Sequence, residues 1–288
     1  MQVMADLMGT EAAMVRVSIS SAAHAMACAL WAVVKPGATI LVATGTPHGQ
    51  DAEVFAELAD WGVRSFALPL RADGSVDLKA IAAAMRSVQP DAVLLQRRPQ
   101  LFAATAHSQT GELPSETPAG SHGAKCLAPL PPHAQAAVQA ASAPKLAHES
   151  AHGQHMHPDQ AGAQGCMKSR LAEARDSAAQ PRQLVPTNDI AAAIRVVRAE
   201  SRSKCSVVVD NSGAELLDNE AMGALGADAV TGSMLGHLGG GLAPEGGYVA
   251  GGRELVERAC ARLCAPGLSL DAGSVPGATQ RKLFQGAA

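Results

Sequence analysis

Short apolar runs alternate with longer apolar or amphipathic segments along most of the chain. The short runs hold four to six residues and are rich in Val, Ile and Leu, as is typical of buried strands. The longer segments follow Ser or Asp and end near Pro or Gly, as is typical of helices. The predicted strands are residues 15–19, 39–42, 63–68, 91–95, 205–209, 227–231 and 247–250, and the predicted helices are 22–34, 51–61, 78–88, 188–199, 221–225 and 253–263. This alternation predicts an α/β protein with a mainly parallel sheet between two layers of helices, a three-layer α/β/α fold.

The alternating pattern stops between residues 99 and 186. This tract is rich in Ala, Gln, Pro, Ser and His and shows no sustained period. Such a composition buries too little apolar surface to offset chain entropy, so it predicts a low-complexity insertion that is disordered or at most locally helical. The predicted organisation is therefore a first half-domain at 1–98, the insertion at 99–186, and the second half-domain at 187–288.

Seven of the ten histidines fall in the insertion. His148, His152, His155 and His157 are spaced closely enough to bind a metal adventitiously. A solvated low-complexity tract accounts for them without a ligand, so we predict no metal site.

Composition and charge narrow the classes of protein and partner. The formal net charge is −3 and the pI is near 6.4, which argues against a nucleic-acid surface. No apolar run reaches the roughly eighteen residues of a membrane span, and the N-terminus lacks the pattern of a signal peptide. The six cysteines form no CxxC pair, which fits a reducing compartment. We therefore expect a cytoplasmic protein with neither nucleic-acid nor membrane partners.

The densest glycine cluster lies between residues 231 and 248, where six glycines fall within positions 236–248. Glycine is used where φ must be positive or where the backbone must approach a ligand closely. A flexible surface loop is the alternative. The apolar flanks look like buried strand ends, which favours a backbone bent against a ligand.

This glycine-rich stretch resembles the cofactor loop of the aluminium-resistance / methionine gamma-lyase-like family, pyridoxal-phosphate (PLP) proteins of the aspartate-aminotransferase fold. That family reads Gly-Ser, two apolar residues, Lys, two residues, then Gly-Gly-Gly-Leu-Ala-Pro-x-Gly-Gly-Tyr. Residues 232–235 and 239–248 match it, while the position of the Schiff-base lysine is Gly236. The resemblance covers about residues 5–98 and 182–286. It implies the large domain of this fold and a PLP cofactor, and the family's small C-terminal domain is not expected in the chain.

The resemblance also implies where the other cofactor contacts lie. Asp210 ends an apolar strand, where the family places the acid that holds the pyridine nitrogen; a strand-end Asp can also be only a loop cap. Ser21 and His24 match the ends of a Ser-Gly-Thr-His phosphate cup whose middle residues are both Ala here. Ser233 matches a second phosphate donor, and its alternative role is that of a turn residue.

Two further positions follow from the same resemblance. His48, in Gly-Thr-Pro-His, falls on the family's tyrosine and could stack on the cofactor in its place. Arg97 matches the first arginine of a Gln-Arg-Ser-Arg motif and could bind a substrate carboxylate; the alternative is a surface charge. Glu215 is retained although the family's Cys-Tyr-Gly before it is Ser-Gly-Ala here.

Three functions remain open at this stage. The chain could be a PLP-dependent carbon–sulfur lyase, a non-catalytic relative that binds or oligomerises, or a fragment of a longer gene. The lysine both captures the cofactor covalently and shuttles a proton at the substrate α-carbon. Because Gly236 can do neither, we predict a degenerate or non-catalytic relative without covalent PLP. The resemblance further implies a homodimer or higher homo-oligomer and a small amino-acid ligand.

Overall fold

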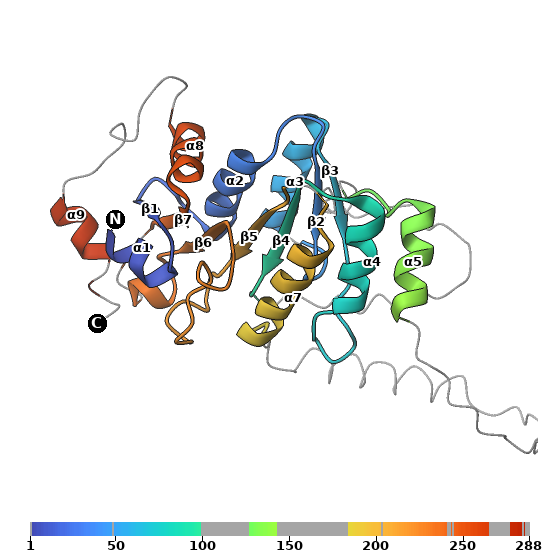
Figure 1. Cartoon of the computed structure of the whole chain (residues 1–288). Coiled ribbons are helices and arrows are strands. Elements are labelled where there is room, and N and C mark those ends of the chain that lie inside the picture. The colour runs from blue at the N-terminus through green and yellow to red at the C-terminus, as the bar shows by residue number, and fades with distance from the viewer. Residues whose placement is uncertain are drawn as a thin grey trace, which may run out of the picture.

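The computed structural model describes residues 2–47, 49–98, 127–142, 184–202, 204–240, 243, 245–264, 277–283 and 285. A seven-stranded sheet runs through the centre, with helices on both of its faces (Figure 1). The strands are β1 Ala12–Arg16, β2 Thr39–Val42, β3 Arg64–Ala67, β4 Ala92–Gln96, β5 Ser206–Asp210, β6 Ala229–Ser233 and β7 Gly247–Gly251. The helices are α1 Gln2–Met8, α2 Ala22–Val33, α3 Gln50–Asp60, α4 Leu78–Val88, α5 Pro132–Ser142, α7 Thr187–Glu200, α8 Arg253–Leu263 and α9 Gly277–Leu283.

The strand order is β1-β7-β6-β5-β4-β2-β3. Neighbours from β6 to β3 pair in parallel, whereas β7 is antiparallel to both β1 and β6. Strand β1 therefore runs in the same direction as β6. The carboxyl ends of β1, β2, β4, β5 and β6 all lie at one edge of the sheet, where open α/β sheets place their ligands.

Two apolar cores fill the spaces between the sheet and its helices. On one face, side chains from α2, α3 and α8 pack against Val208 and Val42. On the other face, side chains from α1, α4 and α7 pack against Val207 and Val209. Successive strand residues point to opposite faces, so neighbouring residues at the carboxyl edge reach different surroundings.

The predicted mainly parallel sheet is confirmed, with most element bounds within three residues. The first strand was predicted at 15–19 but spans Ala12–Arg16, because the apolar run is longer than the strand and pairing with buried β7 sets its register. The predicted helix at 221–225 is wrong. This segment forms turns packed on α1, where the amide of Gly223 donates to the Met8 carbonyl at 2.9 Å. A Cβ on Gly223 would lie 2.5 Å from the Gly9 carbonyl oxygen.

One part of the predicted insertion packs on the domain. Helix α5 lies beside α4 (Figure 1), with Ala134 buried and the Ser142 hydroxyl donating to an Asp77 carboxylate oxygen at 2.9 Å. Residues 132–142 thus form a helix, which is within the local helicity that the sequence allowed. The rest of the tract through residue 183, including its four closely spaced histidines, lies outside the described residues.

Two kinds of feature are absent from the residues that the structure describes. No helix among them has the length and hydropathy needed to cross a membrane. In the same residues, no group of three or more His, Cys, Asp or Glu side chains could hold a metal ion.

Candidate functional site

The carboxyl edge brings Ser21, Asp210 and Ser233 to the same side of the sheet. Ser21 caps α2, which begins after β1 and packs against β5, β6 and β7. Asp210 ends β5, and Ser233 ends its parallel neighbour β6. The Ser21 hydroxyl accepts a hydrogen bond from the His24 amide at 3.1 Å. The first amides of a helix lack intrahelical acceptors, so this N-terminus retains the donors that suit a phosphate.

The other predicted phosphate and stacking residues are less well placed. The Ser233 hydroxyl accepts from the Leu235 amide at 3.1 Å, which is the turn role that the sequence left open. His24 is half-buried, and its Nδ1 accepts from the Ser20 amide at 3.3 Å. Burial lowers the pKa of the His24 imidazole. His48 lies outside the described residues.

Asp210 is fully buried and both of its carboxylate oxygens are engaged. One oxygen, Oδ1, accepts from the Ser212 amide at 3.1 Å and from the Ser212 hydroxyl at 2.6 Å. Oδ2 accepts from Arg98 Nε at 2.8 Å. Its neighbour across the strands, Thr231, has a buried hydroxyl with no hydrogen-bond partner among the described residues. Asp210 is therefore a loop cap through one oxygen and an ion-pair partner through the other.

Arg98 joins Asp210 to a second buried carboxylate, that of Asp51 at the start of α3. Arg98 Nη2 donates to both Asp51 oxygens, at 2.9 and 2.7 Å, and lies 2.7 Å from Asp210 Oδ2. The Gln96 side-chain amide donates to Asp51 Oδ2 at 2.9 Å. Burial opposes the charge on Arg98, but the two carboxylates outweigh burial and raise the Arg98 pKa. We call Asp51, Arg98 and Asp210 the arginine bridge.

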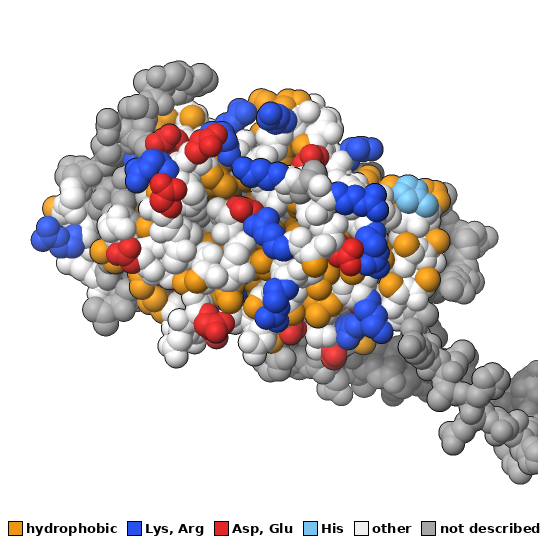
Figure 2. All heavy atoms as spheres, in the orientation of Figure 1, with side chains coloured by type: hydrophobic (Ala, Val, Ile, Leu, Met, Phe, Trp, Pro, Cys, Tyr) orange, Lys and Arg blue, Asp and Glu red, His pale blue; other side chains and the backbone are white. Residues whose placement is uncertain are grey.

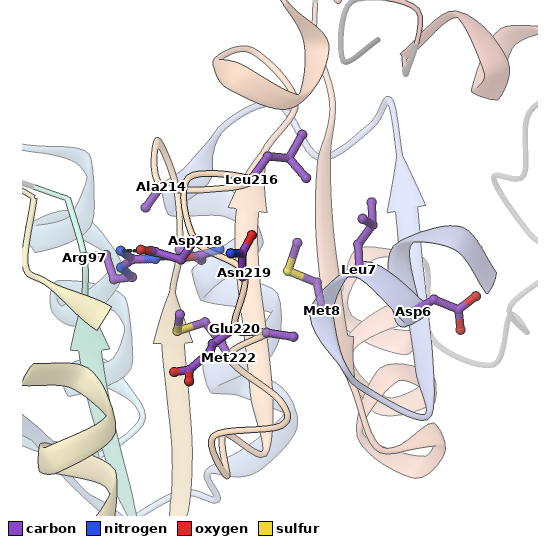
Figure 3. Close-up of a pocket in the computed structure, with 12 residues that line it drawn as sticks. Asp6, Leu7, Met8, Arg97, Ala214, Leu216, Asp218, Asn219, Glu220 and Met222 are labelled. Atoms are coloured by element: carbon purple, nitrogen blue, oxygen red, sulfur yellow. Dashed lines mark hydrogen bonds and ion pairs between the residues drawn. The ribbon is translucent and has the colours of Figure 1, made fainter. Parts of the chain in front are cut away.

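Arg97 reaches the opposite face of the sheet from Arg98. Its guanidinium donates to the Val185 carbonyl at 3.3 Å, to Asn211 Oδ1 at 3.0 Å and to Asp218 Oδ2 at 2.7 Å. It lines a cavity of about 260 Å³ between α1 and the loop after β5, with Met8 and Leu216 also on its wall (Figure 3). Arg97 is thus a buried residue and not a surface charge. Its guanidinium already donates hydrogen bonds to other residues of this chain. The structure does not bring it to the cluster of Ser21, Asp210 and Ser233.

A third buried acid, Glu215, belongs to the loop after β5. Glu215 accepts from the Gly213 amide at 2.7 Å and from the Tyr248 hydroxyl at 3.4 Å. Burial raises the pKa of the Glu215 carboxyl to about 7. A Cβ on Gly232 would lie 2.5 Å from both Glu215 Oε1 and the Tyr248 hydroxyl oxygen, so glycine at this position lets the two side chains meet.

The glycines of the cofactor-like loop have different surroundings. A Cβ on Gly239 would lie 2.0 Å from the Met234 carbonyl oxygen, so the local packing requires glycine there. A Cβ on Gly236 would meet nothing within 4 Å, and Gly236 is exposed with φ outside the left-handed region. The backbone at 236 would accept a side chain, including that of lysine, without a clash at Cβ.

Sequence reasoning missed the arginine bridge. The residue pattern assigns no role to Arg98 and places Asp51 only at the start of the predicted helix 51–61. The available signal was the pair Arg97-Arg98 directly after Gln96, at the end of a buried strand. The partners of Arg98 come from segments 47 and 112 residues away, which a single sequence does not pair.

The fold, with an acid and a helix N-terminus at the carboxyl ends of the strands, is that of the large domain of the fold-type-I PLP proteins. The chain belongs to the methionine gamma-lyase family, whose model matches residues 1–104 and 167–288. The matched ranges leave out the centre of the low-complexity tract, consistent with its foreign composition.

Comparisons with individual proteins agree on the fold. The uncharacterized protein YnbB of Bacillus subtilis is 24% identical over 94% of this chain, which spans 47% of that protein. The crystal structure of a carbon-sulfur lyase involved in aluminum resistance from Clostridium novyi superposes with TM-score 0.65 at 22% identity, over 99% of this chain and 50% of that one. The pyridoxal-5'-phosphate dependent protein YhfS of Escherichia coli gives 0.55 at 17%, over 99% of this chain and 51% of that one. The chain spans about half the length of these relatives.

The side chains present do not fit PLP held in the family's manner. The helix N-terminus at Ser21 suits a phosphate. Asp210, which the resemblance assigns to the ring nitrogen, already accepts a hydrogen bond from the Arg98 guanidinium. Gly236, at the position of the Schiff-base lysine, has no side chain. A site that has the phosphate-binding helix N-terminus but neither a free acid nor a lysine does not support a reaction step on the cofactor.

Proposed function

We propose that this chain is a non-catalytic relative of the PLP-dependent carbon–sulfur lyases of its family. One observation carries the proposal: Gly236 stands at the lysine position in a loop whose backbone would accommodate a lysine. No clash at residue 236 requires glycine. The glycine therefore removes the reactive amine of a lysine without any change in the packing of the loop.

The lysines that the structure describes support the same conclusion. Lys35 precedes β2 and Lys204 precedes β5, so both lie at the edge opposite to Asp210. Lys79 lies on α4, whose buried side chains join the core on the other face from Asp210. Lys282 lies on α9 next to Leu283, which packs near Gly246 of the glycine-rich loop. An amine that replaces the missing one must reach the carbonyl group to be attacked, and among the described residues no hydrogen bond or ion pair joins any of these four lysines to Asp210.

A weakly active PLP enzyme is the alternative, favoured by the retention of Asp210, Ser21 and Ser233 at one edge. Purification of the full 288-residue chain from cells grown with pyridoxine separates the two. We expect no absorbance band in the imine region, less than one PLP per ten chains after acid release, and no carbon–sulfur cleavage of cystathionine or methionine. Stoichiometric PLP with turnover would establish the alternative.

We further propose that the chain self-associates and binds a small amino-acid ligand. Six exposed large apolar side chains support self-association: Val3, Leu7, Trp61, Leu216, Leu217 and Leu235. Acidic, basic and apolar side chains are mixed on the face seen in Figure 2, which gives no uniformly basic surface for nucleic acid. Light scattering should give at least a dimer, with Leu216→Glu and Leu217→Glu together shifting it to monomer. A monodisperse wild-type monomer at high concentration contradicts the proposal.

A further inference from the structure

We propose that Arg98 takes the place of the cofactor's protonated ring nitrogen on Asp210 and closes this edge to pyridine phosphates. The inference rests on the proposed function and deepens it. Besides lacking the lysine, the site places the Arg98 guanidinium on Asp210, where the protonated ring nitrogen of the cofactor would otherwise bind.

The geometry of the arginine bridge carries this inference. A buried carboxylate at a strand end requires a cation or several donors, and in PLP proteins of this fold the resemblance assigns that task to the ring N–H. Here Arg98 Nε lies 2.8 Å from Asp210 Oδ2 and Arg98 Nη2 lies 2.7 Å from it. The other oxygen accepts two hydrogen bonds from Ser212. Both oxygens of Asp210 therefore already accept hydrogen bonds from this chain, and the oxygen that faces Arg98 is paired with a cation.

A second contact holds Arg98 in this position. Asp51 binds the Arg98 guanidinium through both oxygens, and Asp51 is itself fixed by the Gln96 side-chain amide. Moving Arg98 aside for a ligand would leave two buried carboxylates, Asp51 and Asp210, without their shared cation. A ring nitrogen could neutralise only Asp210. Displacement of Arg98 by the cofactor is therefore unfavourable by the cost of one unpaired buried charge.

Pyridoxamine 5′-phosphate tests the inference without any lysine. It carries the same ring nitrogen and phosphate as PLP but has no aldehyde, so it binds only non-covalently. We would titrate it by fluorescence into wild type, R98S, R98K and the double variant D51N/R98S. R98S leaves both Asp51 and Asp210 without a cation. The double variant removes the charge of Asp51, so that only Asp210 remains for the ring nitrogen, and it keeps the test valid if R98S alone unfolds.

We expect D51N/R98S, and R98S where it folds, to bind at least about tenfold more tightly than wild type and R98K. Adding D210N to D51N/R98S should abolish that gain, because the acid is then gone. Equal binding by wild type and D51N/R98S would overturn the inference, as would no detectable binding by any of the variants. These outcomes are independent of the proposed function, which fails only if wild type carries PLP covalently or turns substrate over.

Discussion

The two ends of the candidate site differ in how their side chains are held. At the arginine bridge, Asp51 and Asp210 are buried, and their oxygens accept hydrogen bonds from three residues, Gln96, Arg98 and Ser212. At Gly236 the backbone is exposed and an added side chain would meet open space. Exchange of lysine and glycine at residue 236 would therefore change little packing. Removal of Asp210 would instead disturb a buried network of hydrogen bonds and ion pairs.

The largest effect should come from breaking the arginine bridge. Arg98→Ala leaves two buried carboxylates without a cation, which we expect to lower the free energy of unfolding by about 3 to 5 kcal/mol. Urea denaturation measures it. Arg86→Ala is the matched control, because Arg86 pairs with Glu200 at the surface and should cost no more than about 1 kcal/mol. Equal losses in the two variants would show that the bridge is not a buried network.

Glu215 should make the free energy of unfolding depend on pH. Its pKa rises from 4.5 to about 7 on folding, through burial. The folded state thus holds the proton more tightly, so the stabilisation is complete below pH 4.5 and is lost as pH rises through about 7. Glu215→Gln should remove a decline on the order of 3 kcal/mol between pH 5 and 8, as followed by urea denaturation at each pH. An unchanged slope in the variant would assign the decline to other groups.

Gly232 tests the packing behind the bridge. A methyl group there would lie 2.5 Å from Glu215 and Tyr248, which are both fully buried and cannot move aside freely. Gly232→Ala should lower the free energy of unfolding by about 2 kcal/mol. Thermal denaturation at fixed pH reports it. A neutral effect would mean that the Glu215–Tyr248 pair relaxes, and the contrast between the two ends of the site would weaken.

The smallest effect is expected at Gly236. Gly236→Lys and Gly236→Ala should each change the free energy of unfolding by less than about 0.5 kcal/mol, because the position is exposed and φ is not left-handed. Chemical denaturation of both variants beside wild type measures this. A loss above about 2 kcal/mol would show that the loop does require glycine, and the contrast with the arginine bridge would fail.

The sheet was predictable and the arginine bridge was not. Strands such as β4 and β5 are short apolar runs bounded by polar residues, and their pattern is local. Asp210 and Ser21 were selected by motif, and both lie at the carboxyl edge of the sheet, while their roles toward a cofactor stay predictions. The opposite directions of Arg97 and Arg98 depend on which residue of β4 faces which core, and the pairing with Asp51 depends on strand order. The turns at 221–225 follow from close contact with α1, which no local pattern encodes.

Borohydride reduction of the wild-type chain with PLP, followed by peptide mapping, tests the central claim most directly. Gly236→Lys combined with D51N/R98S serves as the positive control, and it should trap PLP at residue 236 once the arginine bridge is removed. The account predicts no stoichiometric adduct on any lysine of the folded wild-type chain. A single stoichiometric adduct that is lost in Asp210→Asn would contradict it, since another amine would then serve the cofactor at the same acid.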